Sequence, residues 1–198
     1  MILSVLCCLF VFLGMFLGKK FNLKKESICM ISGLFLINTV VGVIPSSYNV
    51  LYRNYHSSTF LFLILGSILG FLIMKLIGHK YDETDNISIA GFSFLNSYLF
   101  IFHRFSILFL IINILYYVLI GIYIREGKSW ISVVAGCIIG IIFSYISGWA
   151  VGYFLSLIVG FLLFFIFSVY GIVIKNNEKS SYIGLIIGII VAFLGGIL

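Results

Sequence analysis

Uninterrupted apolar runs constrain this sequence more than any other feature. Between charged residues the chain stays apolar over whole helix lengths, as in residues 28–44 and 130–174. With 63% hydrophobic and 9% charged residues, and a mean hydropathy of +1.27, too little polar surface remains to cover a soluble core. The runs also lack the alternation of apolar and polar residues that membrane β-strands have. We therefore predict an all-α integral membrane protein.

Charged and polar breaks divide the chain into eight predicted spans, most of them close to the roughly 20 residues that cross a bilayer. Residues 130–174 are too long for one crossing and predict two, with a brief hairpin between them. Pro45 and the polar stretch after it are expected to end the second span. The predicted spans are residues 2–18, 28–44, 59–77, 87–102, 105–124, 130–148, 154–174 and 182–198. Together they predict one compact membrane domain over residues 1–198.

The distribution of Lys and Arg predicts how these spans are oriented, because cytoplasmic loops carry an excess of positive charge. Ten of the twelve Lys and Arg residues fall at or beside alternate connections: Lys19, Lys20, Lys24, Lys25, Lys75, Lys80, Arg125, Lys128, Lys175 and Lys179. This asymmetry predicts that both termini lie outside. It also accounts for the net charge of +6 without a nucleic-acid partner. The expected partner is the lipid bilayer, and frequent Ile, Phe, Asn, Lys and Tyr suggest a bacterial plasma membrane.

Five pairs of glycines spaced four residues apart predict close packing between helices. They are Gly14 and Gly18, Gly66 and Gly70, Gly136 and Gly140, Gly148 and Gly152, and Gly184 and Gly188. One pair could form a homodimer interface, although packing within the chain is the simpler interpretation. The four cysteines lie in apolar runs without the spacing of a metal or redox motif, so we expect no cofactor.

Neutral polar residues interrupt the fourth and fifth predicted spans. On each span they recur at intervals of three and four, so they share one helix face. The short connection predicts that the two spans are antiparallel neighbours whose polar faces can meet. No Asp, Glu or His, the groups that usually mark ion or proton paths, lies within any predicted span. The candidate substrate-path residues are Ser93, Asn96, Ser97, Asn113, Tyr116 and Tyr117. Simple hydrogen bonding between helices is the alternative interpretation.

Three longer stretches carry a family resemblance: "ISGLFLINTVVGVIPSSYNV", "LGSILGFLIMKLIGHKYDETDN" and "WISVVAGCIIGIIFSYISGWAVGY". With the order of spans and loops, they resemble the ZIP family of divalent-metal transporters over nearly the whole chain. The resemblance implies ligands on spans two, four, five, six and seven, with a metal site between spans four and five. This chain departs from the family's metal-binding motifs. Only Asn96 remains in the fourth span and only Gly121 in the fifth, and Ser46 replaces the glutamate that follows the proline of span two.

The resemblance thus implies transport of a zinc-type divalent ion with a degenerate ligand set. Outside the spans, His79, Asp82, Glu83 and Asp85 could hold such an ion loosely, although a solvated loop is the simpler interpretation. We expect no enzyme, because the sequence offers no set of nucleophile, base and acid. Two alternatives stay open: a transport-inactive regulatory or assembly protein, and a membrane subunit that binds a small uncharged solute.

Overall fold

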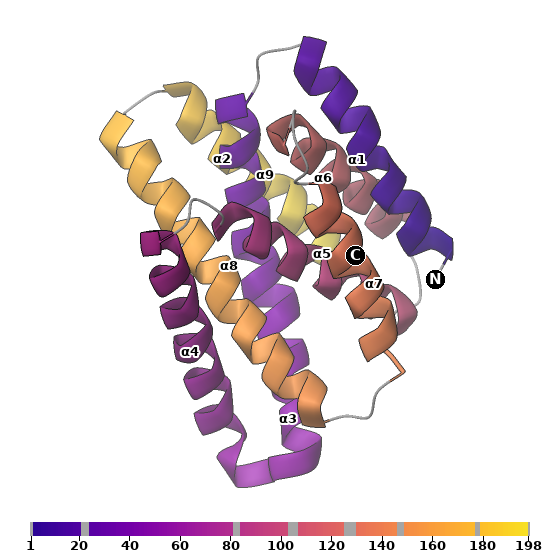
Figure 1. Cartoon of the computed structure of the whole chain (residues 1–198), viewed down its shortest axis with the longest axis vertical. Helices are drawn as coiled ribbons and strands as arrows, with labels where there is room; N and C mark the ends of the chain where they lie inside the picture. The colour runs from indigo at the N-terminus through magenta and orange to yellow at the C-terminus, as the bar shows by residue number, and fades with distance from the viewer. Residues whose placement is uncertain are drawn as a thin grey trace.

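The computed structural model describes residues 2–20, 24–80, 84–102, 107–124, 130–145, 149–176 and 179–197 (Figure 1). These residues are helical apart from a turn at Ser144 and Tyr145, which confirms the all-α prediction for the described part of the chain. The α-helices are α1 (Ile2–Lys20), α2 (Lys24–Ile37), α3 (Ile44–Tyr55), α4 (Thr59–Lys80), α5 (Thr84–Phe102), α6 (Ile107–Ile124), α7 (Trp130–Phe143), α8 (Trp149–Asn176) and α9 (Lys179–Ile197).

Helices α2 and α3 form one continuous rod, joined by a π-helical segment at Asn38–Val43. The expected end of this helix at Pro45 is wrong. Pro45 lies inside this continuous helix, where it donates no backbone hydrogen bond, and the π-helical turn comes directly before it. The Ile44 N–H bonds the Thr39 carbonyl five residues earlier, so the widened turn carries the helix into the proline.

Within the described residues, three helices are long and apolar enough to cross a membrane, judged by length and composition: Glu26–Arg53, His56–Ile77 and Ala150–Gly171. The hairpin between α7 and α8 comes earlier than the sequence predicts. Helix α7 ends at Phe143 instead of near residue 148, and α8 begins at Trp149 instead of residue 154. The uniformly apolar sequence holds no charge or proline that would mark this turn.

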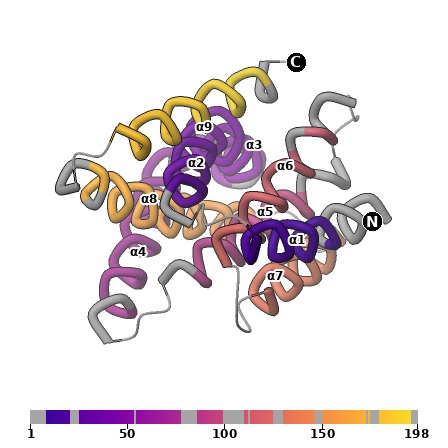
Figure 2. The backbone as a smooth tube through the Cα atoms, turned by 90° about the horizontal axis from the view of Figure 1, so that it is seen from above, coloured from indigo at the N-terminus to yellow at the C-terminus, as the bar shows by residue number. Residues whose placement is uncertain are grey.

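Four close helix pairs build the bundle, and each joins helices that are distant in the sequence: α1 with α6, α5 with α7, α2 with α9, and α4 with α8. Each pair is parallel. For example, Gly14 faces Val118 and Gly18 faces Ile122 further along both α1 and α6. Figure 2 shows α2 and α9 side by side when the bundle is seen from above.

Glycines let these pairs approach closely. A β-carbon at Gly14, Gly140, Gly33 or Gly70 would meet the carbonyl oxygen of Val118, Phe94, Leu185 or Leu157, respectively. The prediction that glycine pairs bring helices together is therefore confirmed for four pairs, all within the chain. Gly148 lies outside the described residues, whereas Gly152 packs against the Leu51 side chain.

The main pairings repeat with inverted direction. Exchanging α1 with α7, α2 and α3 with α8, α4 with α9, and α5 with α6 turns each close pair into another close pair. The same exchange turns the contact between α2 and α6 into the contact between α8 and α5. When the α2–α3 rod is counted as one helix, successive helices alternate in direction (Figure 1). Every exchanged helix therefore runs opposite to its counterpart. The bundle thus consists of two inverted halves.

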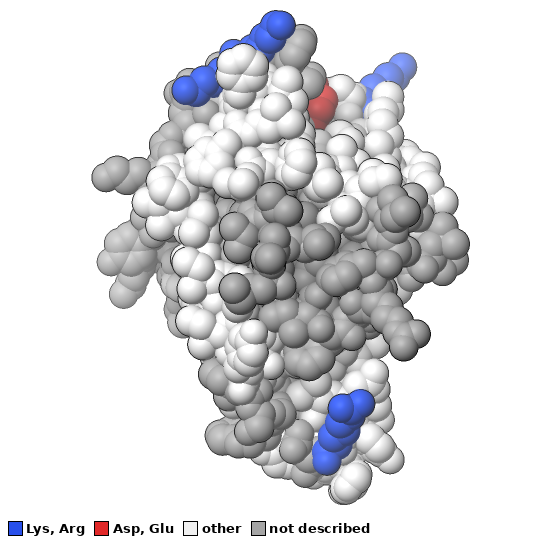
Figure 3. Space-filling view, turned by 90° about the vertical axis from the view of Figure 1, so that its right-hand side faces the viewer, with Lys and Arg blue, Asp and Glu red and all other residues white. Residues whose placement is uncertain are grey.

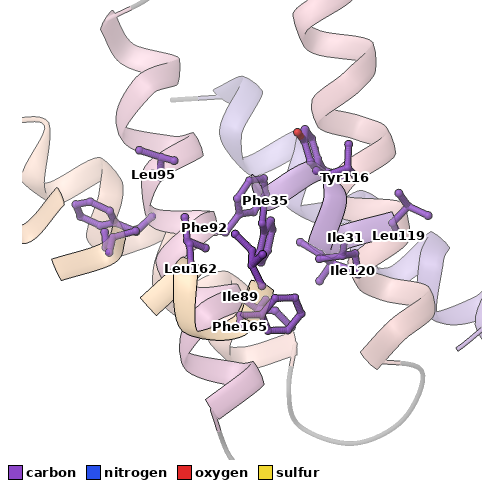
Figure 4. Close-up of a cluster of buried hydrophobic side chains, with 14 of the residues drawn as sticks. Ile31, Phe35, Ile89, Phe92, Leu95, Tyr116, Leu119, Ile120, Leu162 and Phe165 are labelled. Atoms are coloured by element: carbon purple, nitrogen blue, oxygen red, sulfur yellow. The ribbon is translucent and has the colours of Figure 1, made fainter. Parts of the chain in front are cut away.

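The α2–α3 rod, α5, α6 and α8 meet at the centre, where the two halves join. Phe35 of α2 stacks on Phe92 of α5 with ring centroids 4.6 Å apart, and it contacts Phe165 of α8 at 5.3 Å (Figure 4). All three rings are buried. This aromatic core fixes the level of the neighbouring polar residues.

The outer surface of the bundle is apolar between its ends. Large aliphatic side chains are exposed along α4 and α9, as at Leu61, Leu65, Ile186 and Ile190. On the face drawn in Figure 3, the described Lys and Arg residues lie at the two ends of the molecule. Such a belt of apolar side chains suits a nonaqueous environment better than water.

Candidate substrate path at the centre of the bundle

Helix α5 carries the first half of the candidate site. Ser93 and Ser97 are completely buried and Asn96 is 4% exposed. Asn96 lies one turn beyond Phe92 on the same helix face, so it follows the aromatic stack along α5. Ser97 lies on the side of α5 that meets α7, because a β-carbon at Gly140 would be 3.0 Å from the Ser97 Cβ.

Helix α6 carries the second half, with Asn113, Tyr116 and Tyr117 all buried. The Tyr116 hydroxyl accepts a hydrogen bond from the Asn38 Nδ2 at 2.6 Å. The Tyr117 hydroxyl lies 3.5 Å from the Cys137 Sγ of α7, and either atom could donate. The two tyrosines therefore tie α6 to both the π-helical segment and α7.

The prediction that α5 and α6 pack as neighbours because of their short connection is wrong. Helix α5 packs mainly on α7, and α6 packs mainly on α1. The two helices nevertheless meet through side chains, since the Phe92 and Tyr116 rings lie 5.0 Å apart. The structure thus brings the α5 and α6 candidates to the same central region, but not to one continuous helix–helix contact.

Two residues of the π-helical segment join the site. Asn38 contacts Tyr116 directly. Thr39 is completely buried and lies one turn beyond Phe35, as Asn96 lies one turn beyond Phe92. Because α2 and α5 run in the same direction, Thr39 and Asn96 lie at a similar level, one turn beyond the aromatic stack along both helices.

Several buried polar atoms of this region have no hydrogen-bond partner within the described part of the chain. They are Ser32 Oγ, Thr39 Oγ1, Ser93 Oγ, Asn96 Nδ2 and Ser97 Oγ. Leaving a buried donor or acceptor unsatisfied costs about 1–3 kcal/mol each, so most native structures avoid it. These unpartnered atoms on α2, the π-helical segment and α5 are therefore candidates for contact with a bound molecule.

Sequence reasoning identified the α5 and α6 residues but missed Ser32, Asn38 and Thr39. Ser32 stands alone in an apolar run, and Asn38 and Thr39 form an isolated polar pair in one; such side chains are ordinary in a buried helix. Pro45 could have drawn attention to the preceding turn, because proline removes a backbone donor there. A π-helical turn itself has no signature in the hydrophobic pattern.

The structure describes only part of the predicted loop metal site between α4 and α5. Asp82 and Glu83 lie outside the described residues. His79 lies in the last turn of α4 and Asp85 in the first turn of α5, and the structure describes only their backbone. Among the described residues, no three His, Cys, Asp or Glu side chains are grouped to hold a metal ion.

Comparison of the chain with models of known protein families and with curated proteins gives no match. The site therefore has to be interpreted from its own chemistry. It is a buried cluster of amide and hydroxyl groups between two inverted halves, beside an aromatic stack.

Proposed function

We propose that this protein is an eight-span membrane transporter of ZIP-like architecture, with both termini outside and a substrate path through the polar centre of the bundle. The observation that carries the proposal is the unpartnered polar cluster at the junction of two inverted halves. Many secondary transporters are built from inverted repeats and bind their substrate near the middle of the membrane, where the repeats meet. Irregular helix turns often occur there, as the π-helical segment does here.

The placement of charge supports the proposed orientation. Lys19 and Lys20 end α1, Lys75 lies near the end of α4, and Lys179 begins α9. Because successive helices alternate in direction, these positions belong to one end of the bundle, whereas Arg53 near the end of α3 belongs to the other. Positive charge favours the cytoplasmic side. We assign that side to the lysine-rich end, and a bacterial plasma membrane as the location.

The ZIP resemblance supports the choice of path. It implies ligands on spans two, four, five, six and seven. The second, fourth, fifth and seventh correspond to the α2–α3 rod, α5, α6 and α8 at the centre of the bundle, and the sixth corresponds to α7, which packs on α5. It also makes a divalent metal ion the first cargo to test. Amide and hydroxyl oxygens suit hard ions better than zinc, which prefers imidazole and thiolate.

Metal uptake into proteoliposomes tests the proposal. The panel is Zn²⁺, Mn²⁺, Fe²⁺, Co²⁺ and Cd²⁺, measured for the native protein, Asn96→Leu and Asn49→Leu. The control makes the same change at an exposed residue of α3. Saturable flux identifies a metal cargo on the central path if Asn96→Leu, which removes an amide oxygen that can coordinate the ion, reduces it by roughly tenfold or more and Asn49→Leu does not.

Absence of any flux through the folded protein would contradict the proposed transport function. That outcome requires that the protein moves neither these metal ions nor small uncharged solutes such as urea and erythritol. That result would favour the transport-inactive regulatory or assembly role.

A further inference from the structure

We infer that the central site takes a small uncharged solute bearing hydroxyl or amide groups. The inference rests on the proposed transport function and specifies its substrate class. It departs from the metal cargo that the family resemblance implies, for a reason found in the chemistry of the buried residues.

The buried polar side chains of the described chain are all uncharged. Apart from the tyrosines, they are serine, threonine and asparagine. A divalent ion entering this region would lose its water shell with no described acid to balance its charge, which costs far more than burying a neutral polar molecule. An anion would meet the same difficulty, because no described Lys or Arg is buried. The site therefore selects against charge of either sign.

The unpartnered atoms include both hydrogen-bond donors and acceptors, as a neutral polar solute requires. Asn96 Nδ2 donates, and the hydroxyls of Thr39, Ser93 and Ser97 can each donate and accept. The Tyr116 oxygen accepts from Asn38, so its own hydrogen can still be donated. A polyol or a urea-like amide offers donors and acceptors together, and it would satisfy groups that the fold leaves unpaired.

The aromatic stack suits the carbon skeleton of such a molecule. Phe35 and Phe92 lie one turn from Thr39 and Asn96 on the same helix faces. Figure 4 shows Tyr116 close to this stack. A small solute could thus place its polar groups among the amides and hydroxyls and its carbon atoms against the rings, as ligand sites commonly do.

Stopped-flow light scattering of proteoliposomes tests the inference with urea and erythritol as probes. All vesicles should shrink when the solute is added outside, and those that contain the native protein should re-swell faster than protein-free vesicles, with a solute flux that saturates. Asn96→Leu and the milder Ser93→Ala should reduce that flux, the former by about tenfold, as expected for one lost hydrogen bond. Asn49→Leu should leave it unchanged, and equal melting temperatures would confirm that the variants are folded.

The possible outcomes separate the inference from the function on which it rests. Saturable metal flux without solute flux would overturn the inference and leave transport standing. Solute flux that Asn96→Leu and Ser93→Ala both leave unchanged would also overturn it, because the solute would then bypass the site. Absence of both fluxes would overturn the proposed function itself.

Discussion

The hydrogen bond between Asn38 and Tyr116 links the π-helical segment to α6 in the opposite half of the bundle. Tyr116 is 2% exposed and Asn38 is half-buried, so water has little access to the bond between them. Hydrogen bonds between membrane helices contribute about 0.6 kcal/mol on average and up to about 1.7 kcal/mol. This bond is therefore strong enough to hold the segment and weak enough to be exchanged for a ligand.

Tyr116→Phe should destabilise the protein because it removes the oxygen that accepts the Asn38 amide hydrogen. A loss of roughly 1 kcal/mol corresponds to a fall of about 2–4 °C in melting temperature for a chain of this size. The measurement is thermal unfolding in detergent. Tyr145→Phe is the matched control, because Tyr145 is 77% exposed. Equal melting temperatures for the two variants would contradict the assigned hydrogen bond.

At the scale of elements, glycine contacts hold the four parallel helix pairs. Gly33 of α2 illustrates the geometry, because a β-carbon there would overlap the Leu185 carbonyl oxygen and lie 2.9 Å from the Ile189 backbone nitrogen. Backbone atoms cannot turn away as a side chain can. A methyl group therefore has to push α2 and α9 apart.

Gly33→Ala should lower the free energy of unfolding by about 1–3 kcal/mol, the usual cost of overpacking a close contact. Gly171→Ala on α8 is the control, since nothing lies within 4 Å of a β-carbon at that position. Because alanine favours a helix over glycine, the control should be neutral or slightly stabilising. Equal losses for both variants would show that the α2–α9 contact is looser than described. Unfolding of each variant in mixed micelles gives the comparison.

At the scale of the molecule, the two inverted halves explain why the polar cluster lies where it does. Helices α5 and α6 are exchanged by the inversion, as are the α2–α3 rod and α8, and these elements meet at the centre. Under the proposed transport function, the two halves rock about that centre and expose it first to one side of the membrane and then to the other, as in other transporters built from inverted repeats. The buried amides and hydroxyls are the groups that such a motion would uncover.

Much of this fold could be predicted from the sequence, because apolar runs and charged breaks determine where helices lie. The pairing of helices could not. The short connection after Phe102 favours contact between α5 and α6, whereas α5 in fact packs on α7 through Gly136 and Gly140. A glycine pair predicts a close contact without naming the partner. Many apolar helices could fill that role equally well.

The candidate site was predictable to the extent that polar residues are rare in this chain. Asn96 and Tyr116 stand out because they belong to short groups of polar residues on helices that are otherwise apolar. Thr39 does not, since its role depends on the tertiary alignment of Phe35 with Phe92. Hydrogen-bond satisfaction is likewise a property of the packed structure, and no spacing in the sequence reveals which hydroxyls remain unpartnered.

Aqueous access to position 96 tests the central claim most directly, and it requires no knowledge of the substrate. Asn96→Cys and Ala192→Cys are made after the native Cys7, Cys8, Cys29 and Cys137 are replaced by alanine. Residues 96 and 192 are similarly buried, at 4% and 2% exposure, but residue 192 is an apolar position of α9, whose main packing partner is α2. Each variant is treated in vesicles with a small water-soluble thiol reagent. A substrate path predicts that residue 96 reacts and residue 192 does not, whereas equal inertness of both would contradict a path through the centre of the bundle.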